Sequence, residues 1–228
     1  MANMPGQQRT EQTKTPTIKN SYVYGDGSTT FFTNMMPTMM GFFVFFFVFL
    51  ISGMALLKER TSGTLTRLLA TPVRRSEIVF GYTIGYGVLA LIQSTIIVLF
   101  SVYVLNIEVT GSVMLLIAVS VLLAMVALAF GLLMSTFAKS EFQMMQFIPV
   151  IVIPQIFFSG IIPLANMATW AQWLSDILPM KYAANAMNDI VFYGSGWSGI
   201  MGNVLILGVF LVVLLGLNIF GLKRYRKV

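Results

Sequence analysis

The fold class is decided by a run of ten apolar residues, Phe42-Phe43-Val44-Phe45-Phe46-Phe47-Val48-Phe49-Leu50-Ile51. The run does not alternate between apolar and polar residues, as a strand of a membrane barrel does over about 10 residues. Backbone amides in lipid must form hydrogen bonds within their own segment, which leaves the helix as the spanning structure. The run therefore predicts a transmembrane helix.

The charged residues divide the rest of the chain into segments of similar character. Of the 228 residues, 57% are hydrophobic and only 10% are charged, whereas about a quarter are charged in a soluble domain. A span requires about 20 apolar residues. The chain is therefore predicted to be an all-α polytopic membrane protein. The charge-free stretches are 27–57, 78–107, 109–138, 142–175 and 190–222, and the spans predicted within them are about 37–57, 78–105, 113–137, 142–162 and 198–222.

The fourth span differs from the others because it contains Pro149, Pro154 and Gly160. Proline removes a backbone donor and clashes with the preceding helical turn. This span is therefore expected to be kinked or broken near its outer end.

Two shorter amphipathic helices are expected between the spans. The first covers 59–71, where Leu65, Leu68 and Leu69 share one face at helical spacing. The second covers 166–178 and carries tryptophan on its apolar side. With its tryptophans outside, the second helix is expected to lie flat on the outer leaflet of the membrane.

The basic residues indicate the orientation of the chain. Ten of the fourteen Lys and Arg residues share one side of a five-span protein, in loop 58–77, at Lys139 and in the tail 223–228. By the positive-inside rule this side is cytoplasmic. The N-terminus is therefore expected outside and the C-terminus inside.

This orientation makes residues 1–35 a polar, poorly ordered extracytoplasmic leader, followed by the transmembrane permease domain at 36–228. The leader contains no apolar signal core. Either the first span carries it across the membrane as a reversed anchor, or a preceding transmembrane helix is absent from this chain.

Several chemical functions are disfavoured by composition. The chain has no cysteine and no histidine, which excludes disulfides, thiol chemistry and the commonest metal ligand. Residues 194–199 match the dinucleotide pattern GxGxxG, but that motif requires a βαβ unit, and no GxxxxGK(S/T) phosphate loop is present. The net charge of +6 comes from residues beside span ends and does not indicate nucleic-acid binding. We expect no catalytic residue, metal site or cofactor in this chain.

The polar residues inside the spans are uncharged. Proton and ion relays normally require ionisable groups, so a transporter driven by a proton gradient is disfavoured. Each polar side chain is expected to form hydrogen bonds with a neighbouring helix. The alternative, a place on a substrate path, is kept for Gln93, Gln146, Gln155 and Asn203.

Two segments carry a family resemblance. Residues 59–73 read ERTSGTLTRLLATPV, and SGIIPL at 159–164 is followed by LPMKYA at 178–183. These resemble the ErxxGTlexLlxtPv stretch and the sGiffPl…lPltYa passage of type-2 ATP-binding-cassette (ABC) transporter permeases, in particular the drug- and antibiotic-export branch. The two matches occur in the family's order and on the predicted sides of the membrane.

The resemblance implies the permease subunit of an ATP-driven exporter in a bacterial or archaeal plasma membrane. In that family the short helix docks on a separate ABC ATPase, and two permease subunits, identical or different, switch between inward- and outward-facing states. The implied substrate is a small drug-like or lipid-like amphiphile moved out of the cell, and membrane lipid is a further partner. The leucines would fill a groove in the ATPase, the charged residues would contact its polar rim, and the glycine would allow close approach. The coupling residues implied are Glu59, Arg60, Gly63, Thr64, Leu65, Arg67, Leu68, Leu69 and Pro72.

The chain also departs from the family. Thr66, Tyr82 and Asn188 stand where Glu, Lys and Arg are common. The family has six spans, so the resemblance and the charge pattern both suggest that the first span and most of an outer domain are absent here. Such a chain should insert into the membrane but be incomplete as a transporter. The rival interpretation is a non-transporting immunity, sensor or scaffold subunit, or the remnant of a broken permease.

Overall fold

The computed structural model describes residues 31–161 and 167–221. Within these ranges no strand is present, and five helices are long and apolar enough to cross a membrane. The prediction of an all-α protein with five spans is confirmed. The leader up to residue 30 and the basic tail lie outside the described residues. The candidate spans are Met35–Thr61, Ser76–Tyr103, Val113–Ser135, Glu141–Ile161 and Trp197–Gly221.

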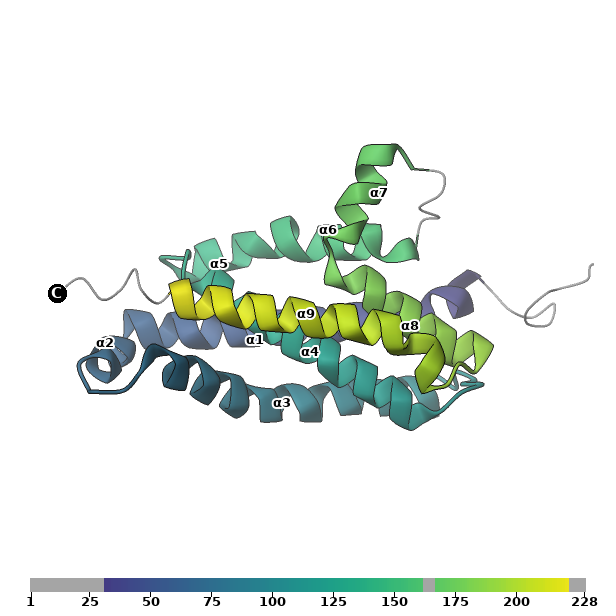
Figure 1. Cartoon of the computed structure of the whole chain (residues 1–228), viewed down its shortest axis with the longest axis horizontal. Coiled ribbons are helices and arrows are strands. Elements are labelled where there is room, and N and C mark those ends of the chain that lie inside the picture. Colours follow the sequence, from purple (N-terminus) through teal and green to yellow (C-terminus); the bar gives the residue numbers. More distant parts are fainter. Residues whose placement is uncertain (1–30, 162–166, 222–228) are drawn as a thin grey trace, which may run out of the picture.

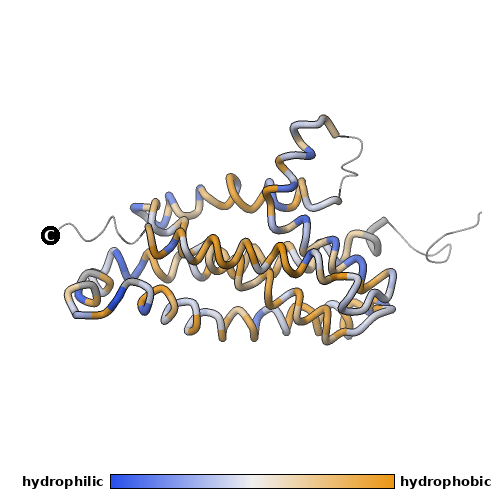
Figure 2. Tube along the Cα trace, viewed as in Figure 1, coloured by the Kyte–Doolittle hydropathy of each residue, from blue (hydrophilic) through white to orange (hydrophobic). Residues whose placement is uncertain are grey.

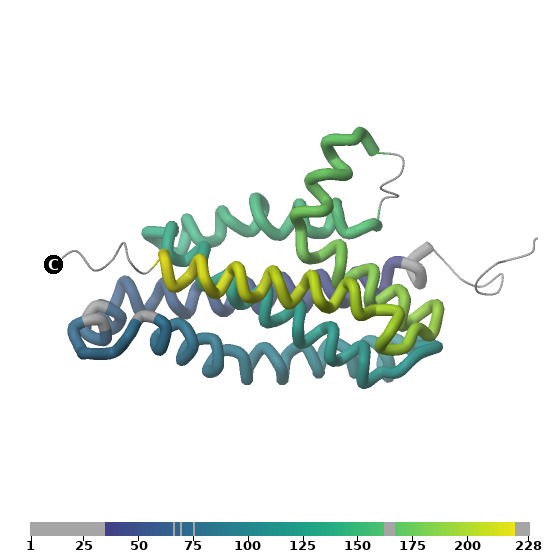
Figure 3. Tube along the Cα trace, in the orientation of Figure 1, coloured from purple at the N-terminus to yellow at the C-terminus, as the bar shows by residue number. Residues whose placement is uncertain are grey.

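The helices run back and forth along one long axis (Figure 1). Apolar residues fill the middle of the bundle and hydrophilic residues gather towards its two ends (Figure 2). Following the colours of Figure 3, α1 runs towards the end that carries α2, α3 returns, and α4 runs towards the α2 end again. The first elements are α1 (Phe31–Thr61), α2 (Thr64–Leu69), α3 (Arg75–Tyr103) and α4 (Val113–Ser135).

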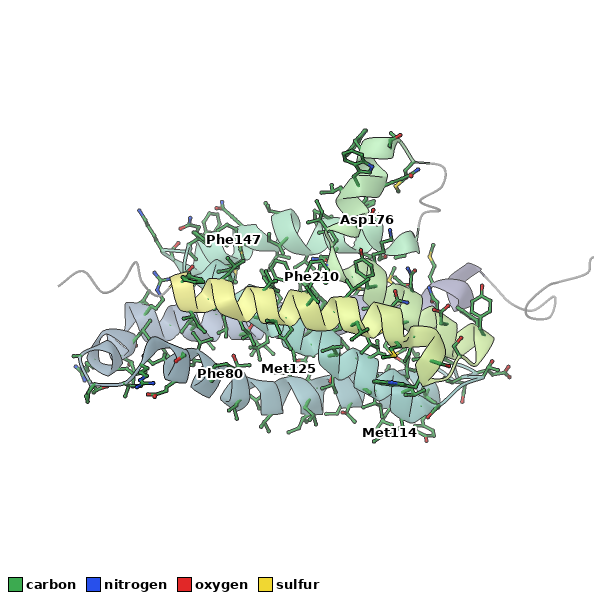
Figure 4. All side chains as sticks on the ribbon, viewed as in Figure 1. Phe80, Met114, Met125, Phe147, Asp176 and Phe210 are labelled. Carbon is green, nitrogen blue, oxygen red and sulfur yellow. The ribbon has the colours of Figure 1, made fainter. Side chains whose placement is uncertain are left out.

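Helix α4 forms the centre of the bundle and packs against α1, α3, α8 and α9. Its contact with α1 is the closest, because Gly131 lets the two backbones approach. A β-carbon at Gly131 would collide with the Ser52 hydroxyl and lie 2.5 Å from the carbonyl oxygen of Phe49. On the other side of α4, Met125 lies against Gly87 of α3 (Figure 4).

The fourth span is broken, as the two prolines and the glycine predict. At its centre the backbone widens into π-helical turns, where the Ile153 N–H bonds to the carbonyl of Ile148. Gly160 adopts a left-handed conformation with φ 99°, which only glycine adopts at low cost. The span consists of α5 (Glu141–Phe147), η1 (Ile148–Val152), α6 (Ile153–Ile156) and η2 (Phe157–Ile161).

The amphipathic helix expected over 166–178 is α7 (Thr169–Asp176), which is shorter at both ends. It lies across the long axis of the spans and stands away from the bundle (Figure 1). Trp170 and Trp173 on it are about 70% exposed, and Asp176 lies at its last turn (Figure 4).

Helix α8 (Pro179–Tyr193) was not predicted from the sequence. It lies between the spans at the end opposite α2 and packs against α1, α4 and α9. Its boundaries carry ordinary signals, since Pro179 occupies the first turn and Gly194 ends the helix with φ 62°. The last span, α9 (Trp197–Gly221), then returns to the α2 end.

The close approach of α1 and α4 gives a stability prediction. Gly131→Ala should lower the free energy of unfolding by roughly 1–3 kcal/mol or more, because overpacking here meets backbone atoms that cannot move aside. Thermal unfolding in detergent measures the change. Gly208→Ala on α9 is the matched control, since its β-carbon would meet nothing within 4 Å. Equal melting temperatures for the two variants would contradict the proposed close packing.

Candidate functional site

The helix predicted over 59–71 is found only in part as the short helix α2 (Thr64–Leu69), because residues 59–61 continue α1. The chain turns into it at Gly63, whose φ is +79°. A β-carbon at Gly63 would meet nothing within 4 Å, so within this chain glycine is required for its left-handed conformation and not for close approach. The Arg67 N–H donates to the Gly63 carbonyl at 3.1 Å, which joins the turn to α2.

The leucine stripe of α2 does not face outward as a whole. Leu65 is only 2% exposed and belongs to the core of this chain. Leu68 is half-buried and packs against the same core, while the side chain of Leu69 lies outside the described detail. The contact of Leu65 with a partner's groove stays a prediction, and in this structure the apolar surface of Leu65 is buried by its own chain. Thr64 and Arg67 are exposed.

Glu59, expected on the rim of a partner, instead turns towards α3. The Tyr86 hydroxyl donates to Glu59 Oε1 at 3.1 Å, and the Tyr82 hydroxyl donates to Oε2. The two tyrosine rings are one helical turn apart and stack with centroids 6.1 Å apart and 8° between their planes. Both carboxylate oxygens therefore have donors from α3.

Arg60 also binds within the chain. Its Nη1 donates to the carbonyl oxygens of Ser135 and, at 3.2 Å, Ala138. These carbonyls lie at the end of α4, where the last helical carbonyls have no partner inside the helix. The expected role of Arg60 on a partner's rim is replaced by a cap on α4.

A hollow of about 660 Å³ lies between α2 and the first turns of α3. Its walls combine charged and apolar groups, so it differs from a purely lipid-facing groove. Glu77 on its α3 side accepts a hydrogen bond from the Arg74 N–H at 3.0 Å, which caps the start of α3. The lining includes Glu59, Arg67, Leu68, Glu77, Ile78 and Tyr82.

The four residues kept for a substrate path lie on four different elements. Gln93 on α3 lines an apolar groove of about 480 Å³ beside α1, and its Nε2 has no hydrogen-bond partner among the described residues. Gln155 is buried in α6, and its Oε1 accepts from the Met180 N–H of α8 at 3.1 Å. Gln146 is exposed on α5, and Asn203 is partly exposed on α9.

The site contains residues that sequence reasoning missed. Tyr82 was noted only as a departure from a family pattern, and Tyr86 was not singled out. A usable signal was present, because two tyrosines four residues apart lie on one helix face. That face begins the span directly after Glu59 and the short helix, so a hairpin brings it within reach.

Five membrane-length helices, with a short helix between the first two, define a multi-pass α-helical membrane protein. The family model for ABC-2 type transporters matches residues 12–192, and the chain belongs to this family. The resemblance found in the two sequence segments is thereby confirmed.

Several relatives carry names that describe transport. ABC transporter G family member 20 of Dictyostelium discoideum is 33% identical over 186 residues, which cover 81% of this chain and 25% of that protein. The probable multidrug ABC transporter permease YbhR of Escherichia coli K12 is 26% identical, over 68% of this chain and 43% of its own. The linearmycin resistance permease protein LnrN of Bacillus subtilis is 28% identical, over 82% and 48%. This chain spans a quarter to about half the length of these relatives.

The two faces of α2 give a prediction about folding. Leu65→Asp should cost several kcal/mol of stability, because an unpaired charge would enter the core of the chain. Thr64→Asp should leave the stability almost unchanged, since the neighbouring Thr64 is exposed. The fraction of each variant that elutes as a monodisperse peak in detergent is the measurement. Equal yields would show that α2 does not pack inward at Leu65.

Proposed function

We propose that this chain is the permease subunit of an ATP-driven exporter and that α2 with its flanking turns docks on a separate ABC ATPase. The observation that carries the proposal is a six-residue helix at one end of the bundle, between two spans, in an ABC-2 family chain. The docking surface consists of five exposed residues, Thr64, Arg67, Thr71, Pro72 and Val73. Leu68 borders this surface at the hollow beside α3.

The α2 end faces the cytoplasm in this proposal. Among the described residues, the α2 end carries Lys58, Arg67 and Arg74, and Lys139 lies in the turn after α4. Basic residues concentrate in cytoplasmic loops. The N-terminus is then outside and the C-terminus inside.

Helix α7 has the features of a helix at a membrane surface. Its exposed Trp170, Trp173 and Ile177 form a stripe, and tryptophan favours the level of the lipid headgroups. Because α7 lies across the span axis (Figure 1), it is parallel to a membrane surface. With the α2 end in the cytoplasm, as proposed, this surface is the outer leaflet.

ATP hydrolysis belongs to the partner, and a second permease subunit, identical or different, completes the pathway. Relatives named as multidrug and linearmycin-resistance permeases support an amphiphilic substrate. Gln93 is the best supported of the four candidate path residues, because its amide lines an apolar groove. Gln146, Gln155 and Asn203 remain candidates on the other helices.

Orientation is testable by labelling single cysteines, because the natural chain contains none. Thr64 and Glu108 are exposed at opposite ends of the bundle. In intact cells a membrane-impermeant maleimide should label Glu108→Cys, and it should label Thr64→Cys only after permeabilisation. Labelling of Thr64→Cys in intact cells would overturn the orientation.

Docking and export are testable by purifying the chain from its native membrane, where we expect an ABC ATPase to co-purify. Arg67→Glu should weaken ATPase binding roughly tenfold, equivalent to about 1.4 kcal/mol, and lower ATP-dependent uptake of a fluorescent amphiphile into inverted vesicles, which corresponds to export from the cell. Glu108→Lys, an equal change of charge at the other end, is the control. A wild-type chain that binds no ATPase, or an Arg67→Glu variant with full binding and export, would contradict the proposed docking surface.

A further inference from the structure

The last turn of α1 carries two adjacent charged residues that reach in different directions. Glu59 binds α3 through two tyrosine hydroxyls, and Arg60 binds α4 through backbone carbonyls. Both residues lie within the three positions that precede the turn into α2. The junction between α1 and α2 is therefore fastened to two other spans.

The fastening to α3 has a rigid geometry. Each oxygen of the Glu59 carboxylate has its own donor, and hydrogen bonds to an ionised acceptor are roughly twice as strong as neutral ones. Tyr82 and Tyr86 stack on each other, which restricts the motion of both rings. The three side chains form a bracket between the last turn of α1 and the cytoplasm-proximal turns of α3.

The fastening to α4 uses backbone atoms. Arg60 satisfies the carbonyls of Ser135, the last residue of α4, and of Ala138 in the turn that follows, and its guanidinium group is planar with several donors in fixed positions. Because α1 and α4 are already in close contact at Gly131, Arg60 adds a second point of attachment nearer to α2. Two points of attachment prevent rotation of one helix about the other.

The turn that follows would otherwise act as a hinge. Gly63 has a left-handed backbone with free space around it, so a displacement of α2 could be absorbed by rotation at that residue. The bracket at Glu59 and the burial of Leu65 oppose such rotation from the two sides of the turn.

We propose that Glu59 and Arg60 are positioning residues that make α1, α3 and α4 move as one unit when α2 is displaced. The inference rests on the proposed function, since α2 is displaced by the ATPase in that proposal. Glu59, Tyr82 and Tyr86 transmit the movement to α3, and Arg60 transmits it to α4. Without these contacts, a displacement of α2 is absorbed by rotation at Gly63 and does not reach α3 or α4.

The first test needs no ATPase. Spin labels at Thr64→Cys and Glu108→Cys, on the otherwise cysteine-free chain in lipid nanodiscs, report the distance between α2 and the opposite end of the bundle. The wild-type distance distribution should be narrow. Glu59→Ala should broaden it, and so should the double variant Tyr82→Phe/Tyr86→Phe, which removes only two hydroxyl groups and should still fold. Glu59→Gln, which keeps one acceptor oxygen, should broaden it less.

Matched controls separate the bracket from general effects. Tyr103→Phe removes an exposed hydroxyl from the same helix, and Glu141→Gln neutralises an exposed carboxylate whose contact with Lys58 is 3.9 Å. Both should leave the distribution unchanged. Wild-type widths for both Glu59→Ala and the double tyrosine variant would overturn the bracket, whatever the outcome with an ATPase.

The second test measures coupling. With the co-purifying ATPase, Glu59→Ala should keep ATPase binding and ATP hydrolysis, while substrate exported per ATP hydrolysed should fall roughly tenfold, as expected for loss of charge-assisted hydrogen bonds. For Glu59→Gln, the substrate exported per ATP hydrolysed should fall less than for Glu59→Ala. A broadened distribution with an unchanged ratio would show that the bracket is only structural. Absence of ATPase binding by the wild-type chain would overturn the coupling role together with the proposed function. The bracket would still be tested by the spin-label distances, which need no ATPase.

Discussion

The close parallel approach of α1 and α4 at Gly131 is the constraint on which the rest of the bundle depends. Because both helices run towards the α2 end, their last turns meet there. From Gly53, which faces Gly131, Arg60 is seven residues further along, about 10 Å of helix. That rise brings its side chain to the carbonyls at the end of α4. A wider spacing would separate these groups and leave the end of α4 uncapped by this chain.

Lipid as a solvent explains how the broken fourth span is tolerated. Prolines and a left-handed glycine remove regular backbone hydrogen bonds, and such interruptions persist in a membrane only where other protein groups satisfy the backbone. Gln155 is buried beside the interruption and accepts a hydrogen bond from the first turn of α8. Asn218 has a comparable role between α9 and α4, where its amide donates to the Ala129 carbonyl at 2.9 Å. Gln155 and Asn218 therefore join helices, as the isolation of polar residues among apolar ones suggested for the spans.

The extent of prediction from sequence follows from the same physics. The spans were predictable because lipid excludes charge, so each span appears in the sequence as a long stretch without charged residues. Helix α8 was not, because its 15 residues include Lys181 and Asp189 and its burial depends on contacts with distant helices. At the candidate site, the motif located α2 correctly. The inward turn of Leu65 and Glu59 could not be predicted, since an amphipathic stripe looks the same whether it packs on its own chain or on a partner.

The inward turn of these side chains changes how the short helix can act. A helix held only by its connections would need a large buried area on its partner to transmit movement, because its own flexibility would absorb the displacement. Here Leu65 is buried in the core of the chain and Glu59 is bound to α3, so α2 behaves as part of the bundle. In the proposed function the partner contacts the exposed face of α2, where Thr64 and Arg67 lie. The stiffness that coupling requires would then come from this chain, because Leu65 and Glu59 already hold α2 and the turn before it.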